Sequence, residues 1–208
     1  SKPANKPVVA SDLDPVIITG QTALAVAPAD TDEFLISDAG TLKRIDASLV
    51  GADGITEADQ WRLSANTNSG SSADVTSNWE RTDNTLQTYI GTGMTESSGI
   101  FTFPTTGKYL ITLNASFYLA GNDWGAFNLH ATNDNFSTTL NFGYASAKNN
   151  SGTDGDGYNG VLTLILDITN VSTHKVKTST GSFSSGTYLI GSSTQNESYI
   201  TFIRLGDT

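Results

Sequence analysis

The chain of 208 residues contains no cysteine. It therefore forms no disulfide bond, and it offers neither a thiolate metal ligand nor a cysteine nucleophile. The redox compartment cannot be read from this residue type, and the stability of the chain must come from packing alone.

Charged residues are few, and basic residues are the scarcer kind. Only 15% of the residues are charged, and 21 acidic residues stand against 11 basic ones, which gives a net charge of -10. No basic patch is larger than Lys43-Arg44. Such a surface repels nucleic acid and anionic lipid, so we expect no nucleic-acid partner.

Long apolar runs are also missing. No segment approaches the ~20 apolar residues that span a bilayer, and the opening residues SKPANKP contain no apolar run of signal-peptide type. The sequence also lacks a glycine-rich phosphate loop. We therefore expect no membrane insertion and no cofactor.

Aromatic residues are nearly absent from the first 60 residues, where Phe34 is the only one, and four of the five prolines lie at or before Pro28. This uneven composition predicts an extended N-terminal arm, residues 1–57, and one packed domain, residues 58–208. Within the arm, residues 32–46 (DEFLISDAGTLKRID) predict a β-hairpin with its turn at Asp38-Ala39-Gly40.

The packed domain shows the period of β-strands. From Tyr109 to Leu119 the odd positions are all apolar, whereas Lys108, Thr112, Asn114 and Ser116 are polar. Further strand patterns follow at short intervals, and no stretch has sustained helical periodicity. We expect an all-β domain that opens at residues 60–63 and has strands at 79–81, 99–103, 108–119, 126–131, 138–144, 160–168, 174–180 and 198–205. Their number and spacing predict a two-sheet sandwich.

Two of these strands are apolar on both faces. Residues 161–166 (VLTLIL) and 199–203 (YITFI) leave no face for water. Another surface must cover the second face, and it is either a subunit interface or the flanking loops and the N-terminal arm. The residues that we assign to an interface or to the core are Val161, Leu164, Ile165, Ile200 and Phe202.

Catalytic and metal-binding patterns are weak. His130 and His174 each lie on a predicted strand without a second ligand at motif spacing. Asp154 and Asp156 flank glycines and could offer oxygens to a cation, but Tyr158 stands where a calcium loop needs another ligand, so a solvated glycine turn fits better. No G-x-S-x-G motif occurs. We expect no metal and no enzymatic activity.

Aromatic residues inside polar segments are the best candidates for ligand contact. Trp124 follows Asn122 and Asp123, and Tyr158 precedes Asn159. Aromatic rings stack on sugar rings, and neighbouring Asn and Asp side chains hydrogen-bond to hydroxyls, so these five residues could contact a glycan. The alternative is that each ring closes one end of the sandwich or packs at a subunit contact.

The strand ending in Pro104, the Thr-Thr-Gly turn and the long strand after it (FTFPTTGKYLITLNASFYL) resemble the opening strands of the C1q/TNF-like jelly roll of tailed-phage virion proteins. The segment DEFLISDAGTLKRID is similar to a short module that precedes distal domains in structural proteins of tailed phages. The resemblance implies a C1q/TNF-like jelly roll that assembles as a homotrimer about a threefold axis.

The resemblance also implies a function. We expect a virion protein of the tail-fibre type that attaches to other virion proteins through its N-terminal arm and contacts a host surface glycan. One alternative is a capsid decoration protein or head fibre that caps the shell. A second is a secreted C1q-like binding module, which would need an export signal that the opening residues do not show.

Overall fold

A computed structural model describes residues 22, 28–29, 31–50, 54–67 and 70–208. The chain divides into two compact units, Ser1–Asp53 and Gly54–Thr208. Most of the first 30 residues of the predicted N-terminal arm thus lie outside the described residues.

The first unit contains a β-hairpin followed by a 3₁₀ turn. Strands β1 (Glu33–Asp38) and β2 (Thr41–Asp46) pair in antiparallel register, and the turn covers Ala47–Leu49. The hairpin turn consists of Ala39 and Gly40, whose φ angles of 49° and 81° are both positive. Two positive φ angles give the twist that a two-residue hairpin needs. The hairpin predicted from the sequence is therefore present, with its turn at the expected place.

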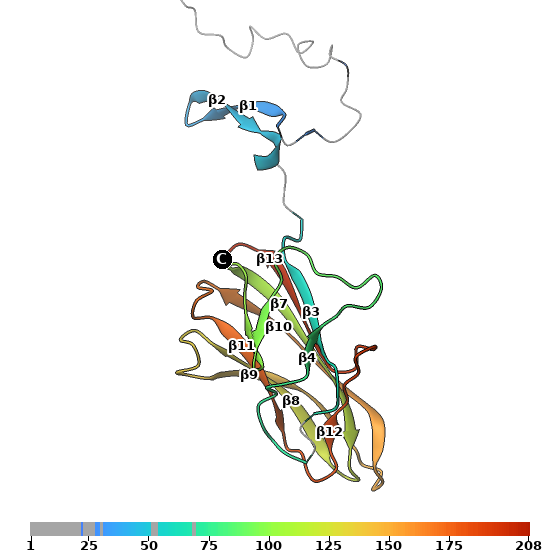
Figure 1. The fold of residues 1–208 in the computed structure, drawn as a ribbon. Coiled ribbons are helices and arrows are strands. Elements are labelled where there is room, and N and C mark those ends of the chain that lie inside the picture. Colours follow the sequence, from blue (N-terminus) through green and yellow to red (C-terminus); the bar gives the residue numbers. More distant parts are fainter. Residues whose placement is uncertain (1–21, 23–27, 30, 51–53, 68–69) are drawn as a thin grey trace, which may run out of the picture. The chain divides into compact units, whose positions relative to one another are not determined.

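The second unit is a sandwich of two antiparallel sheets (Figure 1). The first sheet has the order β10-β7-β13-β3-β4, with β12 also paired to β7, and the second has the order β5-β6-β11-β8-β9. The all-β jelly-roll sandwich predicted from the sequence is confirmed. The bounds are β3 Ala58–Leu63, β4 Trp79–Arg81, β5 Thr95–Ser97, β6 Ile100–Thr102, β7 Gly107–Leu119, β8 Trp124–Thr132, β9 Leu140–Lys148, β10 Gly155–Ile168, β11 Lys175–Gly181, β12 Tyr188–Leu189 and β13 Tyr199–Gly206.

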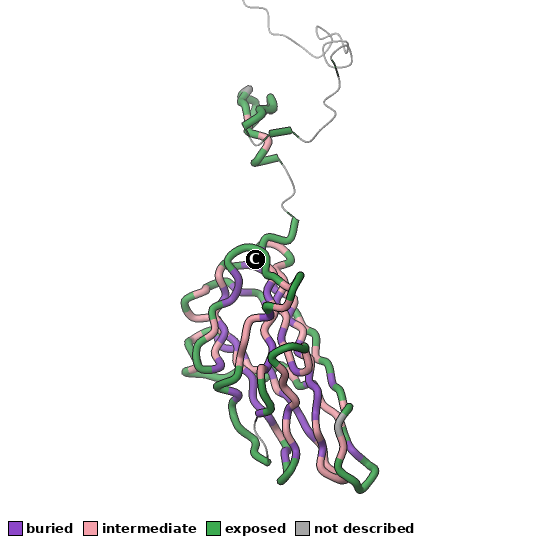
Figure 2. The backbone as a smooth tube through the Cα atoms, turned by 45° about the vertical axis from the view of Figure 1, so that its right-hand side comes forward, coloured by how far each residue is buried: buried purple, intermediate pink, exposed green. Residues whose placement is uncertain are grey.

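The core lies between the two sheets, and β7 contributes most to it. The odd positions of β7 are buried, as the alternation predicts. Aromatic rings from both sheets fill the centre. The ring centroid of Phe101, for example, lies 5.4 Å from that of Phe202 and 5.1 Å from that of Trp79. In Figure 2 the buried positions run along the strands of the sandwich, whereas the hairpin of the first unit is almost entirely exposed.

Both ends of the second unit's chain lie at one end of the sandwich. Arg204 near the C-terminus donates its backbone N–H to the carbonyl of Glu57, just before β3. Strand β7 starts at this end, because Lys108 pairs with Gly206, and it runs to Leu119 at the opposite end (Figure 1). The loops at residues 120–123 and 182–187 therefore lie at the end away from the termini, which we call the loop end.

The edges of the two sheets nearly touch on one side of the sandwich. A Cβ added to Gly160 of β10 would lie 2.5 Å from the backbone nitrogen of Ser146 in β9. A Cβ on Gly143 would lie 3.1 Å from the Leu162 side chain. Glycine at position 160 thus lets the backbones of two strands from different sheets approach closely, and glycine at position 143 leaves room for the Leu162 side chain.

Several strands differ from the sequence prediction in extent. Strands β5 and β12 were not expected, because three and two residues are too few to show a period. Strand β10 begins at Gly155 rather than at residue 160, so Tyr158 and Asn159 belong to a strand and not to a polar loop. Trp124 likewise opens β8 instead of lying in the loop before it.

The contact at Gly160 gives a first prediction. Gly160→Ala should destabilise the protein by about 1–3 kcal/mol, because the added methyl group forces the edges of β9 and β10 apart. The matched control is Gly206→Ala in β13, where an added Cβ meets no atom within 4 Å. Thermal unfolding of both variants measures the difference, and equal melting temperatures would contradict the proposed contact between edges.

Candidate functional site

One face of the first sheet points away from the core and carries matched rows of side chains. Neighbouring strands are in register here, so residues of one type stand side by side. We call these six positions the ladder face: Ile165, Leu110 and Ile203 form an apolar row, and Thr163, Thr112 and Thr201 form a hydroxyl row. The Thr112 and Thr163 hydroxyls lie 3.3 Å apart, and Gln60 Nε2 donates to Thr201 Oγ1 at 2.8 Å.

The residues that the sequence assigned to an interface or to the core separate between the two faces of the first sheet. Ile200 and Phe202 are buried in the core, and Leu164 is half-buried against it. Val161 and Ile165 point outward and are 60% and 58% exposed. The described loops of the second unit therefore leave the outer face of β10 uncovered. Cover by such loops was one of the two alternatives for this face.

The apolar surface continues around the edge of the sandwich. Leu140 and Phe142 of β9 are 40% and 44% exposed, and they line a hollow of about 300 Å³ together with Ile165 of β10. Lys175 and Asp167 also line this hollow. An apolar patch of this kind, bordered by charged groups, is typical of interaction surfaces.

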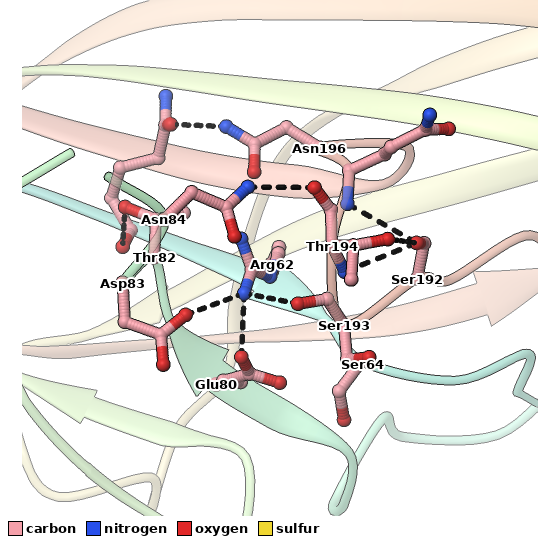
Figure 3. Close-up of polar contacts among 12 residues, drawn as sticks. Arg62, Ser64, Glu80, Thr82, Asp83, Asn84, Ser192, Ser193, Thr194 and Asn196 are labelled. Atoms are coloured by element: carbon pink, nitrogen blue, oxygen red, sulfur yellow. Dashed lines mark hydrogen bonds and ion pairs between the residues drawn. The ribbon is translucent and has the colours of Figure 1, made fainter. Parts of the chain in front are cut away.

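A buried arginine fixes the loop beside the ladder face (Figure 3). Arg62 of β3 is fully buried, and its Nη2 donates to Glu80 Oε1 at 2.6 Å, to Asp83 Oδ1 at 2.7 Å and to the carbonyl of Ser193 at 2.5 Å. A buried guanidinium needs such partners, since an unpaired charge in the interior is costly. The network therefore holds residues 192–196 against β3 and β4. No feature of the sequence marked Arg62 as buried.

Asp123, a candidate glycan contact, serves the fold at the loop end. Its Oδ2 accepts hydrogen bonds from Thr187 Oγ1, from Ser184 Oγ at 2.8 Å and from the Ser184 backbone N–H at 3.2 Å. Burial alone raises the pKa of this carboxyl, but the hydrogen bonds from Thr187 and Ser184 outweigh it, and the pKa lies below its ordinary value of 3.8. Asp123 thus joins the loop before β8 to the loop before β12.

Trp124 faces away from Asp123's partners and lies on the outer face of the second sheet. Its ring packs edge-on against Tyr144 of β9, with centroids 5.8 Å apart. Tyr144 is 53% exposed, so the pair presents an aromatic surface to solvent. This contact between Trp124 and Tyr144 could not be predicted from the sequence, because it depends on the register between β8 and β9.

A chain of polar side chains lies next to this aromatic pair. His130 Nε2 lies 2.7 Å from Ser179 Oγ, its Nδ1 lies 2.5 Å from Asn141 Oδ1, and Asn128 Nδ2 donates to Ser179 Oγ at 3.1 Å. The order serine, histidine, asparagine is one that nucleophilic enzymes use. Ser179 exposes only 9% of its surface, however. We therefore interpret the chain as a link between β8, β9 and β11.

The other candidate ligand residues lie apart from Trp124. Tyr158 is half-buried against the core, and Asn159 Nδ2 donates to the carbonyl of Gly157 at 3.2 Å. Asn122 is exposed at the tip of the loop before β8, with a φ of 61°. The five candidate residues thus do not form one site. Asn122, Asp123 and Trp124 are consecutive in the chain and lead into β8 of the second sheet, whereas Tyr158 and Asn159 lie in β10 of the first sheet.

The weak cation candidates do not form a cluster. Asp154 Oδ1 accepts the backbone N–H of Gly121 at 2.9 Å, and the side chain of Asp156 is outside what the structure describes. Among the described residues, no group of three or more His, Cys, Asp or Glu side chains is placed to hold a metal ion. The same residues include no helix of the length and apolarity needed to cross a bilayer.

Comparison with known proteins shows the fold. No protein-family model and no curated protein matches the chain. Among solved structures, murine APRIL superposes with a TM-score of 0.52 at 9% identity, over 72% of this chain and 98% of APRIL. Eiger TNF from S. frugiperda aligns with a TM-score of 0.48 at 19% identity, over 73% of this chain and 93% of Eiger. PRD1 vertex protein P5 aligns with a TM-score of 0.43 at 18% identity, over 74% of this chain and 100% of P5. The second unit is thus similar to the TNF-like jelly roll, as the sequence predicts.

The hydrogen bonds of Asp123 predict a pH-dependent effect. Asp123→Asn should lower the free energy of unfolding by about 1–2 kcal/mol at pH 7, because charge-assisted hydrogen bonds are lost. The folded-state pKa lies below the ordinary 3.8, so this contribution is complete above about pH 4 and disappears as the pH falls through the folded-state pKa.

Urea unfolding at pH 7 and at pH 3 measures the effect. The difference in the free energy of unfolding between wild type and Asp123→Asn should be smaller at pH 3 than at pH 7. The control is Asp154→Asn, which loses only one exposed hydrogen bond. A gap that is the same at both pH values would show that the Asp123 carboxylate does not stabilise the loop end.

Proposed function

We propose that the chain is a non-enzymatic virion protein of a tailed phage, a homotrimeric adhesin of the tail-fibre type. The ladder face carries this proposal. Ile165 of this face and Val161 beside it on β10 are more than half exposed, and the apolar row continues around the edge to Phe142. A surface that places apolar and hydroxyl rows in register can pack against another copy without burying an unpaired charge.

The geometry around the ladder face also favours a defined interface. Arg62 and its partners fix residues 192–196 beside it, and the Asn114 side chain donates to the carbonyl of Glu197 at 3.1 Å. Because these loop residues are already bonded, little conformational entropy would be lost when a second copy docks. A homotrimer would bury the ladder face of each subunit.

The loop end and the outer face of the second sheet remain for contact with the host. The N-terminal arm, residues 1–57, would attach the trimer to other virion proteins, and the termini of the second unit lie opposite the loop end. Trp124 with Tyr144 offers an exposed aromatic surface for a sugar ring, and Asn122 offers an amide nearby. We expect these residues, rather than Tyr158 and Asn159, to contact a host surface glycan.

Breaking the ladder face tests the trimer. Ile165→Asp should convert the trimer to a folded monomer, since it places a charge in the apolar row of the proposed contact while leaving the core intact. The control is Tyr144→Asp, a substitution at similar exposure, 53% against 58%, on the other sheet. Light scattering gives the mass, and circular dichroism verifies folding. A trimeric Ile165→Asp variant would exclude the ladder face as the interface.

Removing the aromatic surface tests adhesion. Trp124→Ala should keep the mass and melting temperature of the assembly but reduce saturable binding of the fluorescently labelled protein to host cells at least tenfold. The control is Tyr118→Ala, which removes a ring that stacks on Tyr188 in the first sheet, 4.8 Å between centroids. Unchanged binding by Trp124→Ala would remove this surface from the candidate site.

The same binding assay separates the alternatives. Wild-type protein that binds a panel of bacterial cells supports the adhesin. A trimer that does not bind cells but binds empty phage capsids would instead be a decoration protein or head fibre. Binding to neither, with a soluble target found outside the virion, would favour the secreted C1q-like module.

A further inference from the structure

One face of the hairpin of the first unit carries three apolar side chains, whereas the opposite face carries Leu35, which is 72% exposed, beside Arg44. Residues opposite each other in an antiparallel pair share a face, and Phe34 pairs with Ile45 while Ile36 pairs with Lys43. Phe34 and Ile36 are 42% and 37% exposed. We call Phe34, Ile36 and Ile45 the apolar face of the hairpin.

The charged residues of the hairpin are already paired within it. Lys43 Nζ bonds to Asp38 on the same face, and Arg44 Nη1 lies 3.0 Å from Glu33 on the opposite face. Residues 33–46 carry a net charge of -1, counting Asp46, against -10 for the whole chain. Copies of the chain repel one another, but this segment contributes little to the repulsion.

Two strands alone are too few for a stable structure. An isolated two-stranded hairpin is marginal in water, and independent stability needs more strands or a partner surface. Every residue of β1 is exposed, so none of the described residues of the first unit covers this strand. The hairpin therefore requires an apolar partner without unmatched charge.

We propose that this partner is the same hairpin in the other subunits, so that three apolar faces pack together in the homotrimer. This inference rests on the trimer proposed above. Residues 47–57 join the hairpin to β3, and this segment spans at most on the order of 40 Å. In a trimer, three hairpins are thus confined to a small volume, at an effective concentration on the order of millimolar.

Spin labelling tests the proposal in the full chain. Because the chain has no cysteine, Ser37→Cys provides a single attachment site, on the face of the hairpin opposite the apolar face. Nitroxide labels in the trimer should give a narrow, short distribution of distances between subunits. Adding Phe34→Asp should reduce the narrow component by more than half, while the mass by light scattering stays that of a trimer.

The matched control is Leu35→Asp, which makes the same substitution one residue along the same strand, on the opposite face. It lowers the strand propensity of β1 equally but should leave the narrow component unchanged. Equal losses from Phe34→Asp and Leu35→Asp, or a broad distribution in the unsubstituted trimer, would overturn the packing of hairpins alone. A monomeric wild-type mass would overturn the proposed trimer and this inference together.

Discussion

The register of β7 is the constraint on which the rest of the second unit depends. This strand pairs with β10 along one edge and with β13 and β12 along the other, and its odd positions form the centre of the core. A slip by one residue would move Thr112 and Asn114 into the core and Ile111 to the surface. The core and the ladder face are therefore two consequences of one register, because Leu110 and Thr112 reach the surface only when Ile111 is buried.

The features that could be predicted from the sequence are those that a local pattern determines. Alternation from Tyr109 to Leu119 identified β7, and Ala39-Gly40 supplied the two positive φ angles of the hairpin turn. The two apolar faces of 161–166 likewise indicated that the second face needs cover, from a subunit interface or from the flanking loops and the N-terminal arm. Each of these depends on neighbours in sequence, so no knowledge of tertiary contacts was needed.

The candidate site was less accessible to this reasoning because it depends on residues far apart in the chain. The Trp124 ring meets Tyr144 through the pairing of β8 with β9, and Asp123 meets Thr187 across 64 positions. The sequence of a loop that contains Asp and Trp predicts ligand contact, but it does not show whether other residues of the protein already donate hydrogen bonds to the Asp carboxylate. The burial of Arg62 could not be predicted for the same reason, because Ser193, whose carbonyl accepts a hydrogen bond from Arg62, lies 131 positions away in the chain.

The arrangement of termini and loops bears on how the protein can vary. The chain enters and leaves the sandwich at one end, and the Arg204 N–H bonds to the Glu57 carbonyl there. The opposite end consists of loops that connect strands whose registers are set elsewhere, so insertions there change the loop without shifting a strand. Under the function proposed above, a recognition surface at the loop end could change in sequence while the paired strands stay the same, so one scaffold would serve different targets.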